Sequence, residues 1–498
     1  MKYNTKGFLI CGTADLPAKS LVLNCNQFNG EFSCMRCLHP GQTFKTEKGG
    51  AVRIFPYDAL KPQFEARTFE QNVQNAISAT ENKDIKGPSF LMTLKSYDIV
   101  KSNAIDYMHG VLLGLNKLLV KLWISSTFSK EKYSISQYVE IIDSRLIQLE
   151  PPAFITRVPR TLSDHFKYWK ASELRSWVFY FLIFFQMHTL CTMQHLWKEY
   201  TYYVDCVLPK QLQKSKQLLS YFVHMFPSLY GDRFLTLNMH SLLHLPDCVE
   251  DLGPLWIYSC FPFENVNGHL MELFHGTQNV ELQIISSVNV FQNMPYMITS
   301  IKDQTYVEFI EKLRHKPVGR KISPTTSSGS FPIGQPAKID ITDDVFGKLV
   351  TEAGFLPTKV LGYKRISHRG TIIHSVEYSR VQLRNMFTVK QFDNENQKIR
   401  YGKILFHLYA KSCECSENLC KCGSVLAVVL EEYEVKKTSI LKENFLCADV
   451  SHIKVAQISN EIHVVNVKKV IDLLVNVKFE SEEDTNYLCE VPNWMESD

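Results

Sequence analysis

Three widely separated acidic residues lie in positions that suit a metal-dependent nuclease. Asp15 follows the apolar run GFLICGTA at 7–14, which predicts a buried strand that delivers an acid at its end. Asp106 lies in AIDYMHG, three residues before His109, and Glu264 lies in CFPFENVNGHL near the predicted start of a helix. Carboxylates are the ligands that suit Mg²⁺, and two such ions can activate a water or a 3′-hydroxyl and stabilise the leaving oxygen. The three acids are therefore candidate catalytic residues.

Each of these acids also has a structural interpretation. Asp15 can end a strand in a turn or cap a helix. Asp106 can orient His109 through a hydrogen bond if their segment is helical, because residues three apart share one helix face. Glu264 can be an acid of a first helical turn that the helix dipole stabilises. Glu173, in KASELRSW, competes with Glu264 for the role of the last catalytic acid.

Cys34 and Cys37 form a Cys-x₂-Cys pair, which is half of a zinc site. Zinc needs four ligands, so histidines must complete the set. His109 is the first candidate for this role and His39 the second, since His39 lies nearby in sequence and the fold can bring His109 close. Buried or free thiols are the alternative. The sequence predicts that the two sulfurs point to one side, with a histidine within reach.

A second group of thiols lies in CECSENLCKC: Cys413, Cys415, Cys420 and Cys422. Four thiols between two predicted strands can close on one zinc ion. A hairpin loop of free thiols is the alternative.

His240 and His244 are spaced four residues apart on a predicted helix. That spacing can bind zinc, but the glutamate of the H-E-x-x-H motif is absent. We therefore interpret these two residues as packed or hydrogen-bonded core histidines.

The composition is that of a folded globular protein, and the sequence shows no sign of export. Of the 498 residues, 45% are hydrophobic and 21% charged, and the net charge of +4 permits nucleic-acid binding through a local patch without arguing for it. The apolar run at the N-terminus is ended by Asp15 and Pro17, unlike a secretory signal. The longest apolar stretch, from Trp177, is too short to span a membrane. The 14 cysteines are thus expected as thiols or zinc ligands rather than disulfides.

The hydrophobic period changes along the chain. From residue 106 to about residue 250, apolar residues recur at intervals of three and four residues, which predicts an all-helical block. The segment 316–336 is rich in Pro, Gly and Ser, as linkers are. After it the period becomes two, which predicts strands. We therefore expect one region over 1–300, a linker over 301–336, and a small β-rich domain over 337–498.

Several blocks of the sequence resemble one transposase family. GTADLPAK with LNCNQFNGEFSCMRC is similar to the segment of CACTA (EnSpm-type) transposases in which an N/T-D-(F/L)-P-A motif is followed by a Gly and a Cys-x₂-Cys pair. IDYMHG resembles their D-x-x-H segment. YWKASELRSWVFY, TLNMHSLLHLPD, GPLWIYSCFPFENVNGHL and HGTQNVELQ resemble downstream blocks of the animal branch, so the resemblance covers roughly residues 7–292 in order. The β-rich tail is similar to the region that follows the transposase core.

The resemblance implies an α+β fold: a truncated ribonuclease-H-like core with a large all-α insertion at about 106–250, followed by a small β-rich C-terminal domain. It implies that Asp15 and Glu264 come close in space with Asp106 near them, that Mg²⁺ binds there if the protein is catalytic, and that the Cys-x₂-Cys pair belongs to a structural zinc site. It also implies DNA as a partner and a nuclear location. Neither a membrane nor a small-molecule substrate is expected.

One departure from the family pattern affects the expected activity. The family's first catalytic Asp lies in a T/S-D-G segment well upstream of the block around Asp15, whereas this sequence starts six residues before Gly7. We therefore expect a catalytically inactive, transposase-derived protein that retains nucleic-acid or protein binding. One alternative is an active Mg²⁺-dependent transposase completed by an upstream segment. Another is an interaction module that binds chromatin or protein through its β domain.

Overall fold

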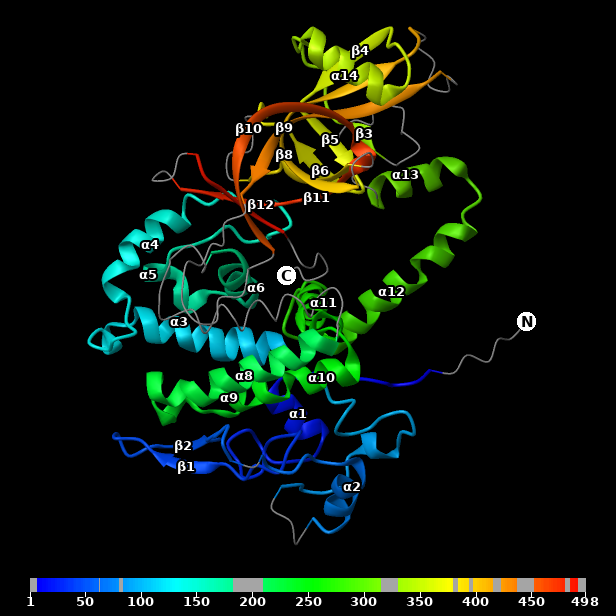
Figure 1. Ribbon diagram of the computed structural model, residues 1–498. Helices are drawn as coiled ribbons and strands as arrows, with labels where there is room; N and C mark the ends of the chain where they lie inside the picture. Colours follow the sequence, from blue (N-terminus) through cyan, green and yellow to red (C-terminus); the bar gives the residue numbers. More distant parts are fainter. Residues whose placement is uncertain are drawn as a thin grey trace.

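The computed structural model describes residues 7–61, 63–79, 84–181, 209–314, 330–378, 384–393, 397–414, 422–436, 452–479 and 484–490. It confirms a mixed α+β architecture (Figure 1), in which a helical block lies between a small N-terminal region and a C-terminal antiparallel sheet. Among the described residues, no helix is long and apolar enough to cross a membrane.

The N-terminal region is built from short elements: α1 (Leu16–Val22), β1 (Gln42–Lys45), β2 (Ala51–Ile54) and α2 (Phe69–Ile77). The two strands form an antiparallel hairpin. They are the only strands named among the described residues before 315. A central sheet of the ribonuclease-H type is therefore not among these elements, and that part of the expected fold stays a prediction.

The apolar run at 7–14 does not form the predicted buried strand. Its only pairing is a single parallel bridge between Gly12 and Asn103, and Phe8 and Ile10 are 71% and 69% exposed. An apolar run becomes a buried strand only when other strands complete its ladder and cover its faces. The described residues supply no such strand beside this run, so the run lies extended on the surface.

The described residues of the predicted block, 106–181 and 209–250, form helices without any named strand, and helices continue beyond them to residue 314. Its main elements are η2 (Met108–Asn116), α3 (Lys117–Ile124), α4 (Val139–Leu146), α5 (Leu162–His165), α6 (Ala171–Ser176), η6 (Trp177–Phe181), α8 (Pro209–Tyr230), α9 (Leu237–Ser241), η10 (Leu242–His244), α10 (Leu245–Leu252) and α11 (Phe261–Met271). The core holds fully buried aromatics such as Trp123 and Trp177. Apolar residues at helical spacing bury one face of each helix, which drives this packing.

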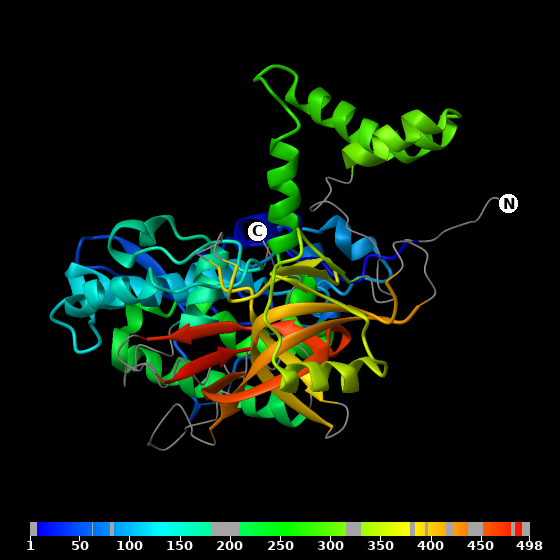
Figure 2. The same cartoon turned by 90° about the horizontal axis from the view of Figure 1, so that it is seen from above.

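Two further helices, α12 (Val280–Ser300) and α13 (Gln304–Arg314), follow the block. The predicted linker at 301–336 is thus partly helical, because it contains α13. Figure 2 shows α12 and α13 clear of the body of the molecule, beyond the end of α11.

The C-terminal region is β-rich, as predicted, and its described residues also contain the α-helix α14 (Asp343–Ala353) and the short 3-10 helix η12 (Val467–Lys469). Its elements are β3 (Phe331–Pro332), α14 (Asp343–Ala353), β4 (Lys359–Tyr363), β5 (Arg365–His368), β6 (Thr371–His374), β7 (Thr388–Asp393), β8 (Lys398–Lys411), β9 (Ser424–Val435), β10 (Ile453–Asn466), β11 (Val470–Leu473), β12 (Val475–Lys478) and β13 (Asn486–Cys489). Eight strands form one sheet in the order β11-β7-β8-β9-β10-β13-β12, with β4 pairing β8, and β3-β5-β6 form a second sheet.

This sheet does not have a core entirely of its own. Val475, Val477 and Phe479 belong to the same buried cluster as the side chains of the helical block. Arg384 adds polar contacts by donating to the carbonyl oxygens of Pro152 and Thr156 at 3.1 and 2.9 Å. The β-rich region therefore packs directly on the helices, which the change of hydrophobic period could not indicate.

Candidate metal centre

Two cysteines and two histidines from distant segments form one cluster. Cys34 and Cys37 lie in the loop between α1 and β1, and His240 and His244 lie one helical turn apart in α9 and η10. Each residue offers one ligand atom, and the four atoms lie within 4.8 Å of one another. Residues four apart share a helix face, so both rings point at the thiols. We call these four residues the Cys₂His₂ cluster.

The spacing inside the cluster fits a tetrahedral zinc ion. The Cys37 Sγ lies 3.2 Å from the His240 Nε2, and the two histidine Nε2 atoms lie 3.3 Å apart. Zinc bonds of about 2.0–2.3 Å in a tetrahedron place neighbouring ligand atoms roughly 3.3–3.8 Å apart. Two thiols with two imidazoles are also an ordinary zinc donor set. The cluster thus offers the number, type and approximate spacing of ligands that zinc requires.

The electrostatics of the cluster favour a thiolate. Burial raises the pKa of the Cys34 thiol, but the Cys37 hydrogen bond and the neighbouring histidine rings outweigh burial and hold this pKa well below its ordinary value. The hydrogen bond with Cys34 correspondingly raises the pKa of Cys37. Burial lowers the pKa of His244, but the Cys34 charge and Asp247 raise it to about 9. Zinc binds thiolates and neutral imidazoles, so its binding would release the protons held here.

Neighbouring groups hold the ligands in place. The backbone N–H of Arg36 donates to the Cys34 Sγ at 3.4 Å. The Nδ1 of His244 lies 3.7 Å from a carboxylate oxygen of Asp247. A carboxylate behind a histidine orients the ring and increases its basicity toward a metal.

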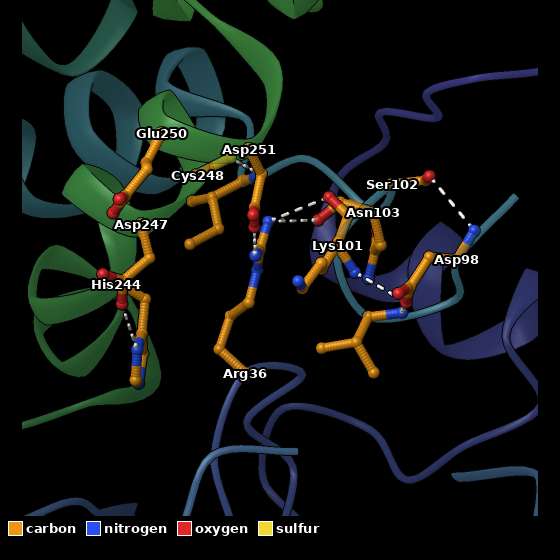
Figure 3. A network of polar contacts seen from close by, with 12 residues as sticks. Arg36, Asp98, Lys101, Ser102, Asn103, His244, Asp247, Cys248, Glu250 and Asp251 are labelled. Carbon is orange, nitrogen blue, oxygen red and sulfur yellow. Dashed lines mark hydrogen bonds and ion pairs between the residues drawn. The ribbon is translucent and has the colours of Figure 1, made fainter. Parts of the chain in front are cut away.

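A buried arginine ties the Cys-x₂-Cys loop to α10 (Figure 3). The guanidinium of Arg36 pairs with Asp251 at 2.5 Å and donates to the carbonyl oxygens of Lys101 and Asn103, each at 3.3 Å. Asp247 and Asp251 lie one turn apart on the helix that follows His244, so a single helix supports a histidine ligand and anchors the thiol loop. A cavity of about 660 Å³ opens beside the cluster and is lined by Arg36 and by three of its four ligands.

The structure corrects the predicted choice of histidines. His39 lies beside the cluster, but its Nε2 contacts the Pro56 carbonyl oxygen at 2.9 Å and its Nδ1 accepts from the Gly41 N–H at 2.9 Å. Both ring nitrogens are occupied, so the ring packs edge-on against His240 instead of facing the sulfurs. His240 and His244 take the places given to His39 and His109, although we interpreted them as core histidines. The sequence feature that indicated these two histidines was their spacing of four residues. We gave it little weight because the glutamate of the H-E-x-x-H motif is absent.

Asp106 and His109 form a separate group with Cys260. The Asp106 carboxylate lies 2.6 Å from His109 Nδ1 and accepts from the backbone N–H groups of His109 and Cys260 at 3.0 and 2.9 Å. Its side chain is only 2% exposed. Burial raises the Asp106 pKa, but these hydrogen bonds outweigh burial and lower it. These hydrogen bonds fit the orienting role of Asp106, and the ligand atoms of Asp106, His109 and Cys260 also lie within 4.8 Å of one another, as the alternative of a metal site requires.

Asp15 and Asp106 both line a cavity of about 250 Å³, together with Lys19 and His109. Asp15 also accepts a hydrogen bond from the Ala18 N–H at 2.8 Å and is the N-cap of α1. The structural interpretation of Asp15 is thus realised, and the two acids face one space as expected.

The candidates for the last acid lie outside this cavity. Glu264 is exposed in the first turn of α11 and is not among the cavity-lining residues. Glu173 is buried in a two-point ion pair with Arg160, with contacts of 2.6 and 2.7 Å. Neither glutamate offers a carboxylate to the space between Asp15 and Asp106.

The second thiol group is described only in part. Cys413 and Cys422 flank the loop between β8 and β9, as the hairpin interpretation expects. Cys415 and Cys420 lie outside the described residues, so a metal site there stays a prediction.

Replacing Asp15 tests its capping role. Asp15→Ala removes an N-cap acceptor, so we expect a loss of about 1 kcal/mol in the free energy of unfolding. Asp15→Asn keeps an acceptor oxygen and should lose less than half of that. Urea unfolding followed by circular dichroism measures both. A loss of equal size in the two variants would show that the carboxylate charge, rather than the cap, stabilises the protein.

The histidine beside Asp106 should titrate far above neutrality. The Asp106 hydrogen bond raises the pKa of His109 to about 10. Because this folded pKa exceeds the ordinary value of about 6.5, the stabilisation from the pair is complete below that pH and is lost as the pH rises toward 10. We expect NMR titration of the His109 ring to give a midpoint above 8 and Asp106→Asn to shift it down by more than one pH unit. An unshifted midpoint in the variant would contradict the pairing.

Comparison with known proteins returned no relative: no protein-family model, no curated protein and no solved structure matches this chain. The arrangement of its own residues therefore carries the functional inference.

Proposed function

We propose that this chain is a transposase-derived, zinc-stabilised protein that binds DNA without cutting it. The observation that carries the proposal is the spatial convergence of the blocks that resemble CACTA transposases. The Cys-x₂-Cys block and the TLNMHSLLHLPD block together supply all four residues of the Cys₂His₂ cluster. The D-x-x-H block and the block that contains Cys260 together supply the Asp106 group. Residues up to 203 positions apart in the sequence, such as Cys37 and His240, thereby come into contact. We would expect such contacts if these blocks were inherited together as parts of one transposase fold.

Zinc in this cluster would have a structural role. Four protein ligands complete its tetrahedron and leave no position for a water or a substrate, whereas catalytic zinc keeps one position open. The ion would clamp the N-terminal loop onto α9 and η10. Zinc therefore adds stability here, and the cluster itself supplies no hydrolytic chemistry.

The acidic residues support a non-cleaving protein. Two Mg²⁺ ions about 3.5–4 Å apart need several free carboxylate oxygens, each about 2.0–2.1 Å from its ion. The Asp106 carboxylate is already engaged by hydrogen bonds, Asp15 caps α1, and Glu264 lies outside their cavity. DNA binding does not need these metals, because phosphate contacts depend on basic surface residues.

Two assays on purified protein test the proposal. In fluorescence anisotropy with duplex DNA we expect binding that weakens at least tenfold between 50 and 200 mM salt, because counterion release makes phosphate binding salt-dependent. In a nicking and strand-transfer assay with Mg²⁺ or Mn²⁺ we expect no product. Absence of DNA binding would overturn the binding role. DNA cleavage by the wild type that is lost in Asp106→Ala would instead favour an active transposase, provided that the variant contains as much zinc as the wild type.

A further inference from the structure

Two separate segments of the helical block bring four lysines together: Lys117, Lys121, Lys167 and Lys170. The first two lie four residues apart in α3, so they share one face of that helix. The other two lie in and just after η5 (Phe166–Tyr168), between α5 and α6. The segments touch, because the Lys117 ammonium donates to the carbonyl oxygens of Lys167 and Trp169, at 3.3 and 3.5 Å (Figure 1). We call these four residues the lysine patch.

The patch stands on the hydrophobic core. Leu119 of α3 belongs to the same buried cluster as Phe166 and Trp169 of the other segment. A buried amide adds a polar contact, since the Nδ2 of Asn116 donates to the Leu174 carbonyl oxygen at 3.1 Å. The backbones that carry the lysines are therefore held in one arrangement, and only the lysine side chains have to adjust to a ligand.

Acidic side chains do not neutralise the patch. Within the described part of the chain, none of its four ammonium groups pairs with a carboxylate. The Glu173 carboxylate is taken by Arg160, with contacts of 2.6 and 2.7 Å, and Asp164 is the other acid nearby. Residues 117–121 and 160–173 together hold five basic and two acidic side chains, a net charge of +3, whereas the whole chain carries only +4.

The surroundings of the lysines favour a nucleic-acid backbone over a membrane. Across the described residues 117–121 and 160–173, Tyr168 is the only large apolar side chain that is exposed, and the Lys167 ammonium lies 4.8 Å from the centre of its ring. Binding to anionic lipid depends on buried apolar area as well as on charge, and this surface offers little such area. Lysine ammonium groups and tyrosine hydroxyls bind phosphate oxygens without burying apolar surface.

We propose that the lysine patch is the surface on which this chain holds the phosphate backbone of duplex DNA. The inference rests on the proposed DNA-binding function and assigns it to named residues. Each ammonium offers three donors, and Lys117 uses two of them for its carbonyl contacts. Every lysine of the patch therefore keeps a donor for a phosphate oxygen. Phosphate contacts carry no sequence information, so the patch binds duplexes of any sequence.

Fluorescence anisotropy of the full chain with two duplexes of unrelated sequence tests the patch. Lys121→Gln combined with Lys170→Gln removes two of the proposed phosphate contacts, and the fold should tolerate both changes because these side chains are exposed. We expect this variant to raise the dissociation constant at least tenfold at 50 mM salt, equally for both duplexes. The slope of log affinity against log salt should fall by about two, one for each contact. The circular dichroism spectrum should not change.

Two further variants separate the patch from charge in general. Lys45→Gln combined with Lys48→Gln makes the same change in net charge at exposed positions of the β1–β2 hairpin, and it should bind DNA like the wild type. Lys121→Arg combined with Lys170→Arg keeps the charge of the patch and should also bind like the wild type. A hairpin variant that loses as much affinity as the patch variant would overturn the proposal.

The possible results also separate this inference from the function on which it rests. A wild type that binds no DNA would overturn both. DNA binding that is equally tight in the wild type and in Lys121→Gln with Lys170→Gln would leave the function standing but reject the patch. Flotation with vesicles of phosphatidylserine and phosphatidylcholine that is lost in the same variant, together with unchanged DNA affinity, would show that the patch binds anionic lipid and would also reject it.

Discussion

Removing the metal ligands should abolish zinc binding and strongly destabilise the protein. We expect one zinc ion per chain in the wild type and none in Cys37→Ser or His240→Asn. Zinc supplies an apparent ~10–16 kcal/mol in small zinc domains. Here it would clamp a loop that other contacts also hold, so we expect a loss of at least ~4 kcal/mol in the free energy of unfolding. Metal analysis by mass spectrometry and denaturant unfolding with and without a chelator measure the two effects.

The controls separate this cluster from the other thiols and histidines. Cys11→Ser changes a half-buried thiol outside the cluster, and it should keep full zinc content. His39→Gln and His109→Gln should also keep it, because neither ring is part of the cluster. Zinc retained in His240→Asn but lost in His39→Gln would show that the proposed ligand set is wrong.

The largest effect without a metal is expected at Arg67. Its guanidinium pairs with Asp84 at 2.6 Å, with the two side chains only 5% and 8% exposed. It also donates to the carbonyl oxygens of Cys34 and Phe32 at 2.8 and 2.7 Å. Arg67→Met leaves a buried carboxylate without its ion-pair partner, which costs about 3–5 kcal/mol. The free energy of unfolding should fall by that amount, and zinc affinity should weaken because the thiol loop loses two anchors.

Two comparisons make this prediction specific. Lys61→Met removes the ion pair with Asp58, in which the Lys61 side chain is 77% exposed and the Asp58 side chain 36% exposed. Exposed ion pairs contribute less than about 1 kcal/mol to the free energy of unfolding. The double variant Arg67→Met with Asp84→Leu removes both charges and should recover part of the loss, because no buried charge remains. An equally small effect in Arg67→Met and Lys61→Met would mean that the buried pair does not stabilise the fold.

The sequence by itself determined the features that depend on local pattern. Apolar spacing of three and four predicted the helical block, and the change to a period of two after the linker predicted the β-rich region, because secondary structure follows which face of a segment is buried. The Cys-x₂-Cys spacing likewise identified half of the candidate metal site, since it places two thiols on one tight turn.

Only the tertiary structure decided which distant residues complete the site. Cys37 and His240 are 203 residues apart in the sequence, and nothing in either segment encodes their contact. The run at 7–14 has the composition of a buried strand, but burial depends on neighbouring strands that local pattern cannot specify. Asp106 has the spacing of a metal ligand with His109, yet the backbone N–H of Cys260, from the start of α11, helps to occupy its carboxylate. Each outcome depended on a long-range partner, and long-range pairing is set by the packing of the whole chain.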